Sequence, residues 1–161
     1  MTSTAPSKNN GTIVTAESVA DILERELDHL IHDWMALVEK QEDLMAVSLS
    51  YEDRTGHLPK LLQDLIARLR LDAGTKAPVS IAAKDHAELR RKQGYSVAMV
   101  VEESRLLQVS IFTILHKNTH HLDYVKLLPD VVTIADEVDA QLKQQMLHYM
   151  EANAIGAKPV K

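Results

Sequence analysis

The chain has 161 residues, of which 45% are hydrophobic and only 4% aromatic, and it carries a net charge of −5 at pH 7. Its length is typical of a single domain, and its aliphatic content is sufficient for a full core. The absence of cysteine excludes disulfides, thiolate catalysis, iron–sulfur clusters and cysteine-ligated zinc.

Charge and hydropathy argue against two classes of partner. Acidic and basic residues are mixed along the chain, whereas nucleic-acid binding usually requires a clustered basic face. No run of about 18 apolar residues is present, so no membrane span is predicted. The first residues, MTSTAPSKNNGT, lack the apolar core of a secretory signal. We therefore expect a cytoplasmic protein.

The first predicted helix follows a polar arm. Residues 1–14 are rich in Ser, Thr and Asn and offer little to bury, so they are predicted to be a disordered N-terminal arm. The helix is predicted to begin at Thr15, a good N-cap, and to continue to about Gln41. Apolar residues recur along it at helical spacing, namely Val19, Leu23, Leu27, Leu30, Trp34, Leu37 and Val38.

The next stretch, residues 42–58, is less regular and is interrupted by Gly56. A second helix is predicted near Pro59, because proline is favoured in the first helical turn. Leucines and isoleucine form its apolar side as far as Leu71. A loop bracketed by Gly74 and Pro78 is predicted to follow.

A third helix is predicted from about Val79 to Gln93, with small apolar residues that allow close helix packing. Gly94 fits the left-handed residue that ends a helix. Ser96 then resembles the N-cap of a fourth helix, which frays near Asn118–His121. This helix is apolar on most sides, which is typical of a central helix or a subunit interface.

The last predicted helix begins near Pro129 and runs to about Asn153. Before it, Asp123 is expected to cap a short segment over Tyr124–Leu128, because proline makes one continuous helix unfavourable. Residues 154–161 are expected to form a C-terminal tail. The chain is thus predicted to be all-α, with about five helices in a helical bundle or a globin-like packing. The helical domain is predicted to span residues 15–153.

The densest polar cluster lies at the corner between the third and fourth helices. His86 and Arg90 are four residues apart on one helical face. Arg90 is expected to pair with Glu103 or Asp85 and to brace the corner, and the cluster is also a candidate ligand- or partner-binding site. The candidate signalling or ligand-contact residues are His86, Arg90, Gln93, Gly94, Tyr95, Glu103 and Arg105.

The histidines suggest three alternative chemistries, which are phosphotransfer, zinc binding and haem binding. A helix-borne His86 beside an acid and a cation is a candidate phosphoacceptor. His116 and His120 lie four apart, with His121 and Asp123 nearby, which is a spacing that zinc can use. However, no glutamate stands between this pair in the HExxH manner, and a solvated helix end is the ordinary explanation.

Other chemistry has less support. Haem requires an apolar pocket and an axial histidine, for which His29, His57 and His86 are the candidates. Carboxylates such as Glu24, Asp28, Asp136 and Glu137 are expected on solvated faces. No metal site, cofactor or enzymatic activity is predicted.

The motif His86-x-x-x-Arg90-x-x-Gln93-Gly94-Tyr95 resembles the N-terminal domain of RsbT co-antagonist proteins, the RsbR/RsbRD type. Related domains also precede some bacterial histidine kinases. Further similarity lies in Glu102/Glu103-x-Arg105-Leu106-Leu107, in Ile31-x-x-Trp34 and in Leu58-Pro59-x-Leu61-Leu62. The resemblance covers roughly residues 17–150.

The resemblance implies a helical sensory module of the bacterial stress response, often dimeric and related to globins without needing haem. In stressosome proteins such a module precedes a STAS domain, which these 161 residues do not include, so a free-standing or excised sensor domain is expected. The expected partners are a second copy of the chain and a downstream signalling protein, either an anti-sigma-pathway kinase or a STAS protein.

Overall fold

The computed structural model describes residues 15–72, 75 and 78–156, and most of these residues are helical. They form eight α-helices and one short 3-10 helix. The β-structure in this part of the chain is limited to an isolated bridge between Glu17 and Leu122. The predicted all-α class is confirmed. The predicted N-terminal arm and the last residues of the tail, 157–161, lie outside the described residues.

The first predicted helix is divided into two, α1 (Val19–Arg25) and α2 (Leu27–Val38). Its start was predicted too early, because the hydroxyl of Ser18 accepts a hydrogen bond from the Asp21 N–H and caps α1. The backbone leaves the helical region at Glu26. This break allows α1 to pack against α5 (Leu58–Leu69) while α2 packs against α7 (Val97–Lys117).

The irregular stretch before α5 contains two short helices, α3 (Glu42–Met45) and α4 (Tyr51–Thr55). Pro59 lies in the first turn of α5, as predicted. The next helix, α6 (Ile81–Lys92), begins after Ser80, whose hydroxyl accepts a hydrogen bond from the Ala83 N–H. The expected loop glycine, Gly74, lies outside the described residues.

The corner between α6 and α7 has the predicted geometry. Gly94 has φ of +86°, which is the left-handed conformation that only glycine adopts without steric cost. The Ser96 hydroxyl accepts a hydrogen bond from the Met99 N–H and caps α7. A 3-10 turn, η1 (Thr119–His121), then leads into the last helix.

The prediction of a break before Pro129 is wrong. The last helix, α8, runs without interruption from Tyr124 to Gly156 and contains Pro129. Proline there removes the N–H that would bond to the Val125 carbonyl. Val125 is 88% exposed, so water can satisfy its carbonyl and the missing hydrogen bond costs little. Asp123 does cap the start, accepting a hydrogen bond from the Val125 N–H at 3.0 Å.

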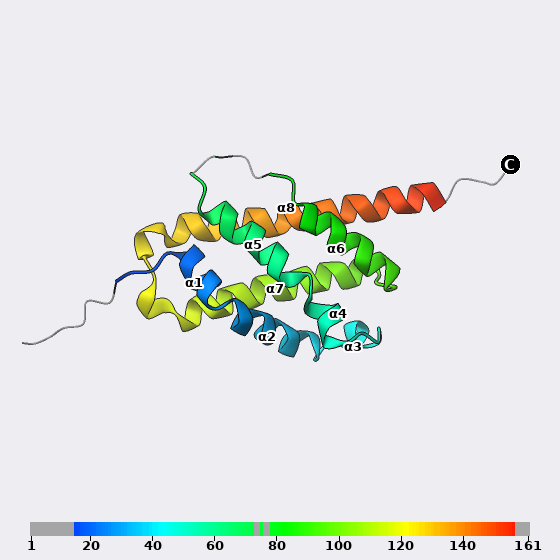
Figure 1. Ribbon diagram of the computed structural model, residues 1–161, viewed down its shortest axis with the longest axis horizontal. Coiled ribbons are helices and arrows are strands. Elements are labelled where there is room, and N and C mark those ends of the chain that lie inside the picture. The colour runs from blue at the N-terminus through cyan, green and yellow to red at the C-terminus, as the bar shows by residue number, and fades with distance from the viewer. Residues whose placement is uncertain (1–14, 73–74, 76–77, 157–161) are drawn as a thin grey trace, which may run out of the picture.

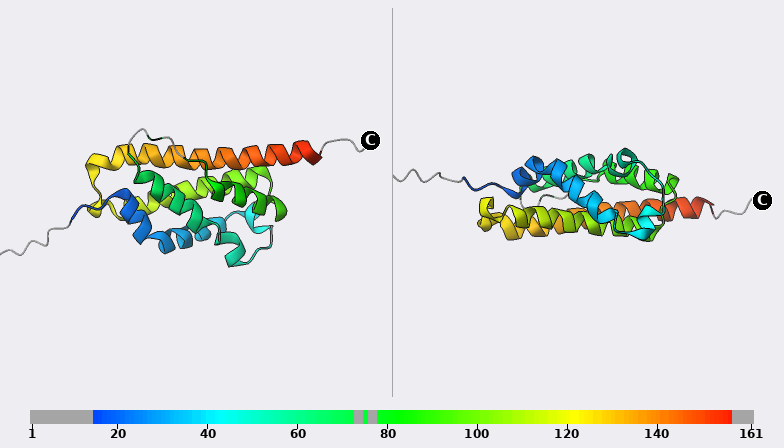
Figure 2. Two further views of the ribbon diagram at one scale, coloured as in Figure 1. Left: turned by 45° about the horizontal axis from the view of Figure 1, so that its top comes forward. Right: turned by 90° about the horizontal axis from the view of Figure 1, so that it is seen from below.

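The helices form two layers, with the core between them. Helices α7 and α8 lie side by side, and α1, α2, α5 and α6 lie on one side of that pair (Figure 2, right). The C-terminal turns of α8 reach beyond the other helices (Figure 1). None of the helices described here is both long and apolar enough to cross a membrane.

Candidate functional site

Arg90 is the centre of the buried polar cluster at the α6–α7 corner, and its side chain is fully buried. Its Nε donates to Oε2 of Glu103 at 2.9 Å. Its terminal nitrogens donate to the carbonyls of Arg54 at 2.7 Å and Asp53 at 3.2 Å, and to Oε1 of Gln93 at 2.7 Å. Arg90 therefore ties the end of α6 to α7 and to α4, and its predicted pairing with Glu103 is confirmed.

A second buried arginine, Arg54 of α4, contacts the same corner. Its Nη1 donates to the Tyr95 hydroxyl at 2.7 Å and to the Leu44 carbonyl at 3.1 Å. The Arg90 guanidinium lies 4.6 Å from the centre of the Tyr95 ring, a cation–π distance. Burial, with a smaller effect of the Glu103 carboxylate, raises the pKa of Tyr95 to about 12. Tyr95 is thus a neutral hydroxyl at physiological pH.

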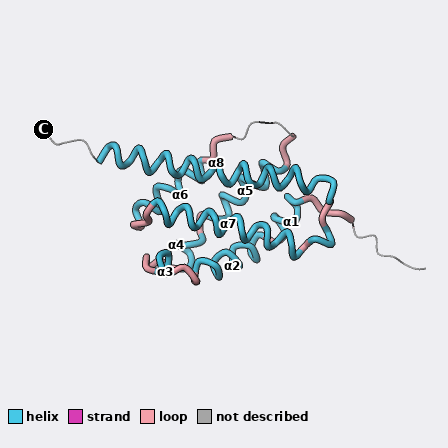
Figure 3. The backbone as a smooth tube through the Cα atoms, turned by 180° about the vertical axis from the view of Figure 1, so that it is seen from behind, coloured by secondary structure: helices cyan, strands magenta, loops and turns pink. Residues whose placement is uncertain are grey.

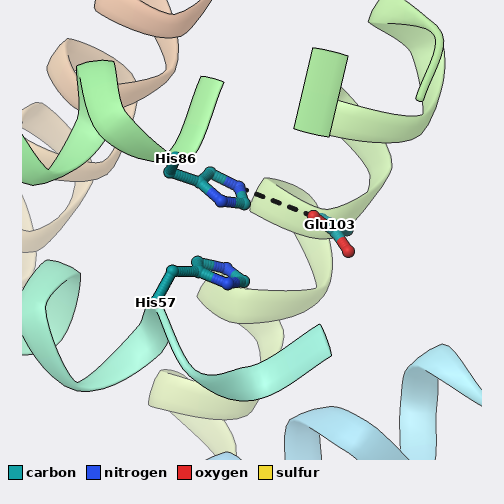
Figure 4. A group of neighbouring side chains, drawn as sticks. All are labelled: His57, His86 and Glu103. Carbon is teal, nitrogen blue, oxygen red and sulfur yellow. Dashed lines mark ion pairs between the residues drawn. The ribbon is translucent and has the colours of Figure 1, made fainter. Parts of the chain in front are cut away.

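Two histidines stack beside this network. The rings of His57, between α4 and α5, and His86, in α6, have centres 3.7 Å apart and planes 13° apart. The His86 Nε2 lies 3.6 Å from Oε2 of Glu103 (Figure 4). Burial lowers the pKa of both imidazoles, that of His57 well below its usual value. Both rings are therefore neutral near pH 7.

Trp34 of α2 completes the arrangement around Glu103. Its ring meets His57 edge-on, with centres 6.2 Å apart. Its Nε1–H donates to the Glu103 backbone carbonyl at 3.2 Å. Trp34 was predicted as a core residue, and it is fully buried. It therefore fixes the backbone of α7 at the residue whose side chain binds Arg90.

A small cavity of about 20 Å³ adjoins the histidine pair. Its polar lining comes from several helices, and α8 contributes Gln141 and Gln145. Three lining residues each have a buried polar atom with no hydrogen-bond partner among the described residues, namely Nδ1 of His57, Nδ1 of His86 and Oε1 of Glu103. Such atoms are rare in folded proteins and call for an explanation.

Most of the predicted site residues meet at this place. His86, Arg90, Gln93, Tyr95 and Glu103 converge there, and Gly94 makes the turn that allows it.

Two other residues named in the predictions lie elsewhere. Arg105 pairs instead with Glu102 at 2.6 Å, where both side chains are open to solvent. Asp85, the alternative partner considered for Arg90, is exposed. Arg105 and Asp85 were each suitable in charge and spacing for a place in the corner cluster, but both side chains are exposed instead.

Sequence reasoning missed Arg54, Gln141 and Tyr149, which come from α4 and α8. Gln145 does interrupt the apolar pattern of α8, and this was the available signal for a buried polar cavity. The prediction of a solvated Glu137 is wrong, because α8 packs along α5 and buries this face. Glu137 accepts a hydrogen bond from Gln141 at 3.0 Å, and burial raises its pKa.

The structure bears on the alternative chemistries as well. His86 is 4% exposed, so a phosphodonor reaches its ring only if the helices separate. The cavity beside it is far too small for a haem. His116, His120 and His121 lie at the opposite end of α7 and are all exposed.

Comparison of the chain with family models, with curated proteins and with solved structures found no match.

Proposed function

We propose that this chain is a non-enzymatic bacterial sensory and regulatory domain of the stressosome co-antagonist type. In this proposal the α6–α7 corner receives the signal, and α8 carries it to a partner protein. The observation that supports it best is a contact between these two regions. The hydroxyl of Tyr149, in α8, is buried and donates to the Tyr95 carbonyl at 3.1 Å.

Other contacts support coupling along the same face of α8. His148 lies 2.6 Å from Oε2 of Glu88, in α6. Gln141 and Gln145 line the cavity that adjoins His86 and Glu103. A change at the corner therefore acts on several successive turns of α8. A small shift of one packed helix against its neighbours is an established way to transmit such a change.

The cluster is built to hold the helices together rather than to perform chemistry on a substrate. Arg90 and Glu103 are buried and already engaged with each other. Breaking a buried ion pair is costly, so any second arrangement of the corner has to give Arg90 and Glu103 new partners. In this proposal the signal stabilises such a second arrangement.

A dimer is proposed through the outer face of the α7–α8 pair, which the other helices described in the structure do not cover (Figure 3). Large apolar side chains remain exposed on these two helices, and an exposed apolar surface marks an interaction site. They are Val97, Val101 and Val109 of α7, and Val125, Leu128, Val132, Leu147, Met150 and Ile155 of α8.

Light scattering at tens of micromolar tests the dimer. The wild-type chain is expected to have twice the mass of the monomer. Val132→Arg introduces a charge on the outer face and is expected to give a monomer. Val79→Arg introduces the same charge before α6, at a position that is even more exposed than Val132, and this matched control is expected to remain dimeric. A monomeric wild-type chain contradicts the dimer.

Transmission through α8 is tested by fusing the chain, through α8, to the catalytic region of a histidine kinase. The expected result is a kinase activity that changes when Tyr149→Phe removes the hydrogen bond to the corner. Tyr124→Phe, which removes an exposed hydroxyl at the other end of α8, is the control. The same activity in all three fusions contradicts a sensory role for the corner. As native partner we propose an anti-sigma-pathway kinase or a STAS protein, which the family resemblance implies.

A further inference from the structure

Three side chains from separate segments converge beside the small cavity. His57 comes from the α4–α5 connection, His86 from α6 and Glu103 from α7 (Figure 4). Their candidate ligand atoms all lie within 4.8 Å of one another. His86 and Glu103 are both buried, together with other polar side chains such as Arg90 and Gln141. Polar side chains placed there need partners.

The hydrogen bonds that Arg90 makes at the α6–α7 corner leave polar atoms of these three side chains without a partner. Arg90 occupies Oε2 of Glu103, but Oε1 has no partner among the described residues, and the same holds for Nδ1 of each histidine. A buried polar atom without a partner costs about 1–3 kcal/mol. The adjoining cavity of about 20 Å³ has room for one small ion or one water.

The donor set has a definite chemical preference. Two imidazole nitrogens and one carboxylate oxygen bind divalent transition metals such as zinc and iron. Such a set leaves at least one coordination position open. The Glu103 oxygen that lies 3.6 Å from Nε2 of His86 is Oε2, which also accepts the hydrogen bond from Arg90. Arg90 then holds the carboxylate in position, as residues behind metal ligands commonly do.

The distances set a clear requirement for binding. Ligand atoms that are each about 2.1 Å from one tetrahedral ion lie about 3.4 Å apart. The observed separations, up to 4.8 Å, therefore require the ligand atoms to approach one another by up to about 1.4 Å. The imidazole planes are only 13° apart, so one ring must also turn to direct its nitrogen at an ion that the other ring binds.

The proposed site also borders a hollow on the surface of the molecule. A surface depression of about 170 Å³ lies on the outer side of the histidine pair. Its lining includes His57 and His86, which also line the inner cavity, and the carboxylate of Asp85. The two rings thus separate the depression from the cavity, and a turn of His57 opens a path between them.

We propose that His57, His86 and Glu103 bind one divalent transition-metal ion of the zinc type. The binding itself does not depend on the proposed function. A role for the ion as the signal that the corner senses does rest on the proposed function. This site differs from the pair His116 and His120, whose spacing is favourable but whose side chains are exposed.

The test begins with chelator-treated protein, to which Zn²⁺ is added in a calorimetric titration, with Co²⁺ absorption as a second readout. One ion per chain is expected. His57 is chosen for substitution because it is only partly buried, whereas His86 is buried. His57→Ala is expected to weaken binding at least about tenfold, because loss of even a supporting residue has an effect of this size. Glu103→Gln is expected to weaken it similarly.

His116→Ala and His120→Ala are the matched controls, because they remove histidines without touching the buried cluster. Both are expected to bind Zn²⁺ as the wild type does. Zn²⁺ is also expected to raise the melting temperature of the wild type but not of His57→Ala, since an ion that binds only the folded state stabilises it. This readout requires only that His57→Ala folds, which circular dichroism checks. If it does not fold, His57→Gln replaces it.

Several outcomes overturn the proposal. They are the absence of stoichiometric binding by the wild type, unchanged affinity in both His57→Ala and Glu103→Gln, and loss of binding in His116→Ala. The first of these outcomes makes the cavity a site for water only. None of them bears on the dimer or on transmission through α8, which are measured on the metal-free chain.

Discussion

Two groups of histidines lie toward opposite ends of α7, and they differ in how the chain assembles them. His116, His120 and His121 are neighbours in sequence, and all three are exposed to solvent. His57 and His86 are far apart in sequence and belong to different segments, yet their rings stack 3.7 Å apart beside the buried Glu103. The exposed group has the sequence spacing of a metal-binding pair but is not buried. The buried group has no such spacing in the sequence.

The difference teaches that spacing alone does not identify a site. Spacing of four residues places side chains on one face of a helix, but it does not decide whether that face is buried. Burial requires a second segment to pack against it. The stretch around α4, whose sequence is irregular, supplies this cover for His86 and Arg90. The comparison therefore predicts large effects of substitution at the buried end and small effects at the exposed end.

The largest expected effect is at Arg90. Arg90→Met leaves Glu103 as an uncompensated buried charge and is expected to lower the free energy of unfolding by about 3–5 kcal/mol. Lys117→Met is the counterpart at the exposed end, where Lys117 pairs with Asp33 at 2.6 Å. An exposed pair contributes about 0–1 kcal/mol. Urea unfolding measures both, and equal losses contradict the distinction between the two ends.

The next effect is at the corner glycine. Gly94→Ala places a side chain on a residue with φ of +86° and is expected to cost about 1–2 kcal/mol. A β-carbon at Gly94 meets no atom within 4 Å, so the cost is that of backbone strain alone. Gly156→Ala, in a helix and equally free of neighbours, is the control. Thermal unfolding of the two variants compares them, and an unchanged melting temperature for Gly94→Ala excludes the strain.

A smaller effect separates two tyrosines of α8. Tyr149→Phe removes a buried hydrogen bond to the Tyr95 carbonyl and is expected to cost about 0.5–1.5 kcal/mol. Tyr124→Phe removes an exposed hydrogen bond to the Thr119 carbonyl, where water replaces the partner, and is expected to cost less. Chemical denaturation of the two variants measures the loss of unfolding free energy in each. A greater loss for Tyr124→Phe is inconsistent with a tie between α8 and the corner.

The smallest effect belongs to the exposed histidines themselves. His116→Ala and His120→Ala are each expected to change the free energy of unfolding by less than about 0.5 kcal/mol, because neither side chain is buried. A loss above about 1 kcal/mol in either variant shows that this group has a structural role, and the contrast with the buried pair then fails.

Local patterns predicted several elements of the fold. The capping serine Ser96, the left-handed Gly94 and the proline at the start of α5 were all foreseeable, because each acts through its own few neighbours in sequence. The uninterrupted α8 was not, because the cost of Pro129 depends on whether the Val125 carbonyl reaches water. That exposure is set by the packing of the whole chain.

The site divides in the same way. Helix spacing across a tight corner left two partners for Arg90, Glu103 and Asp85, and the structure has Glu103. The roles of Arg54 and His57 did not follow from spacing, because they reach the cluster from a segment without a regular pattern. The burial of Glu137 depends on the contact of α8 with α5, which no local pattern encodes.

The central claim is that the buried corner acts on α8, and amide hydrogen exchange along α8 tests it most directly. Glu103→Gln weakens the charged contact with Arg90, and Glu102→Gln makes the same change at the neighbouring, solvent-accessible position. We predict faster exchange over residues 141–149 of α8 in Glu103→Gln and unchanged exchange there in Glu102→Gln. Faster exchange in α6 and α7 with α8 unchanged contradicts the account.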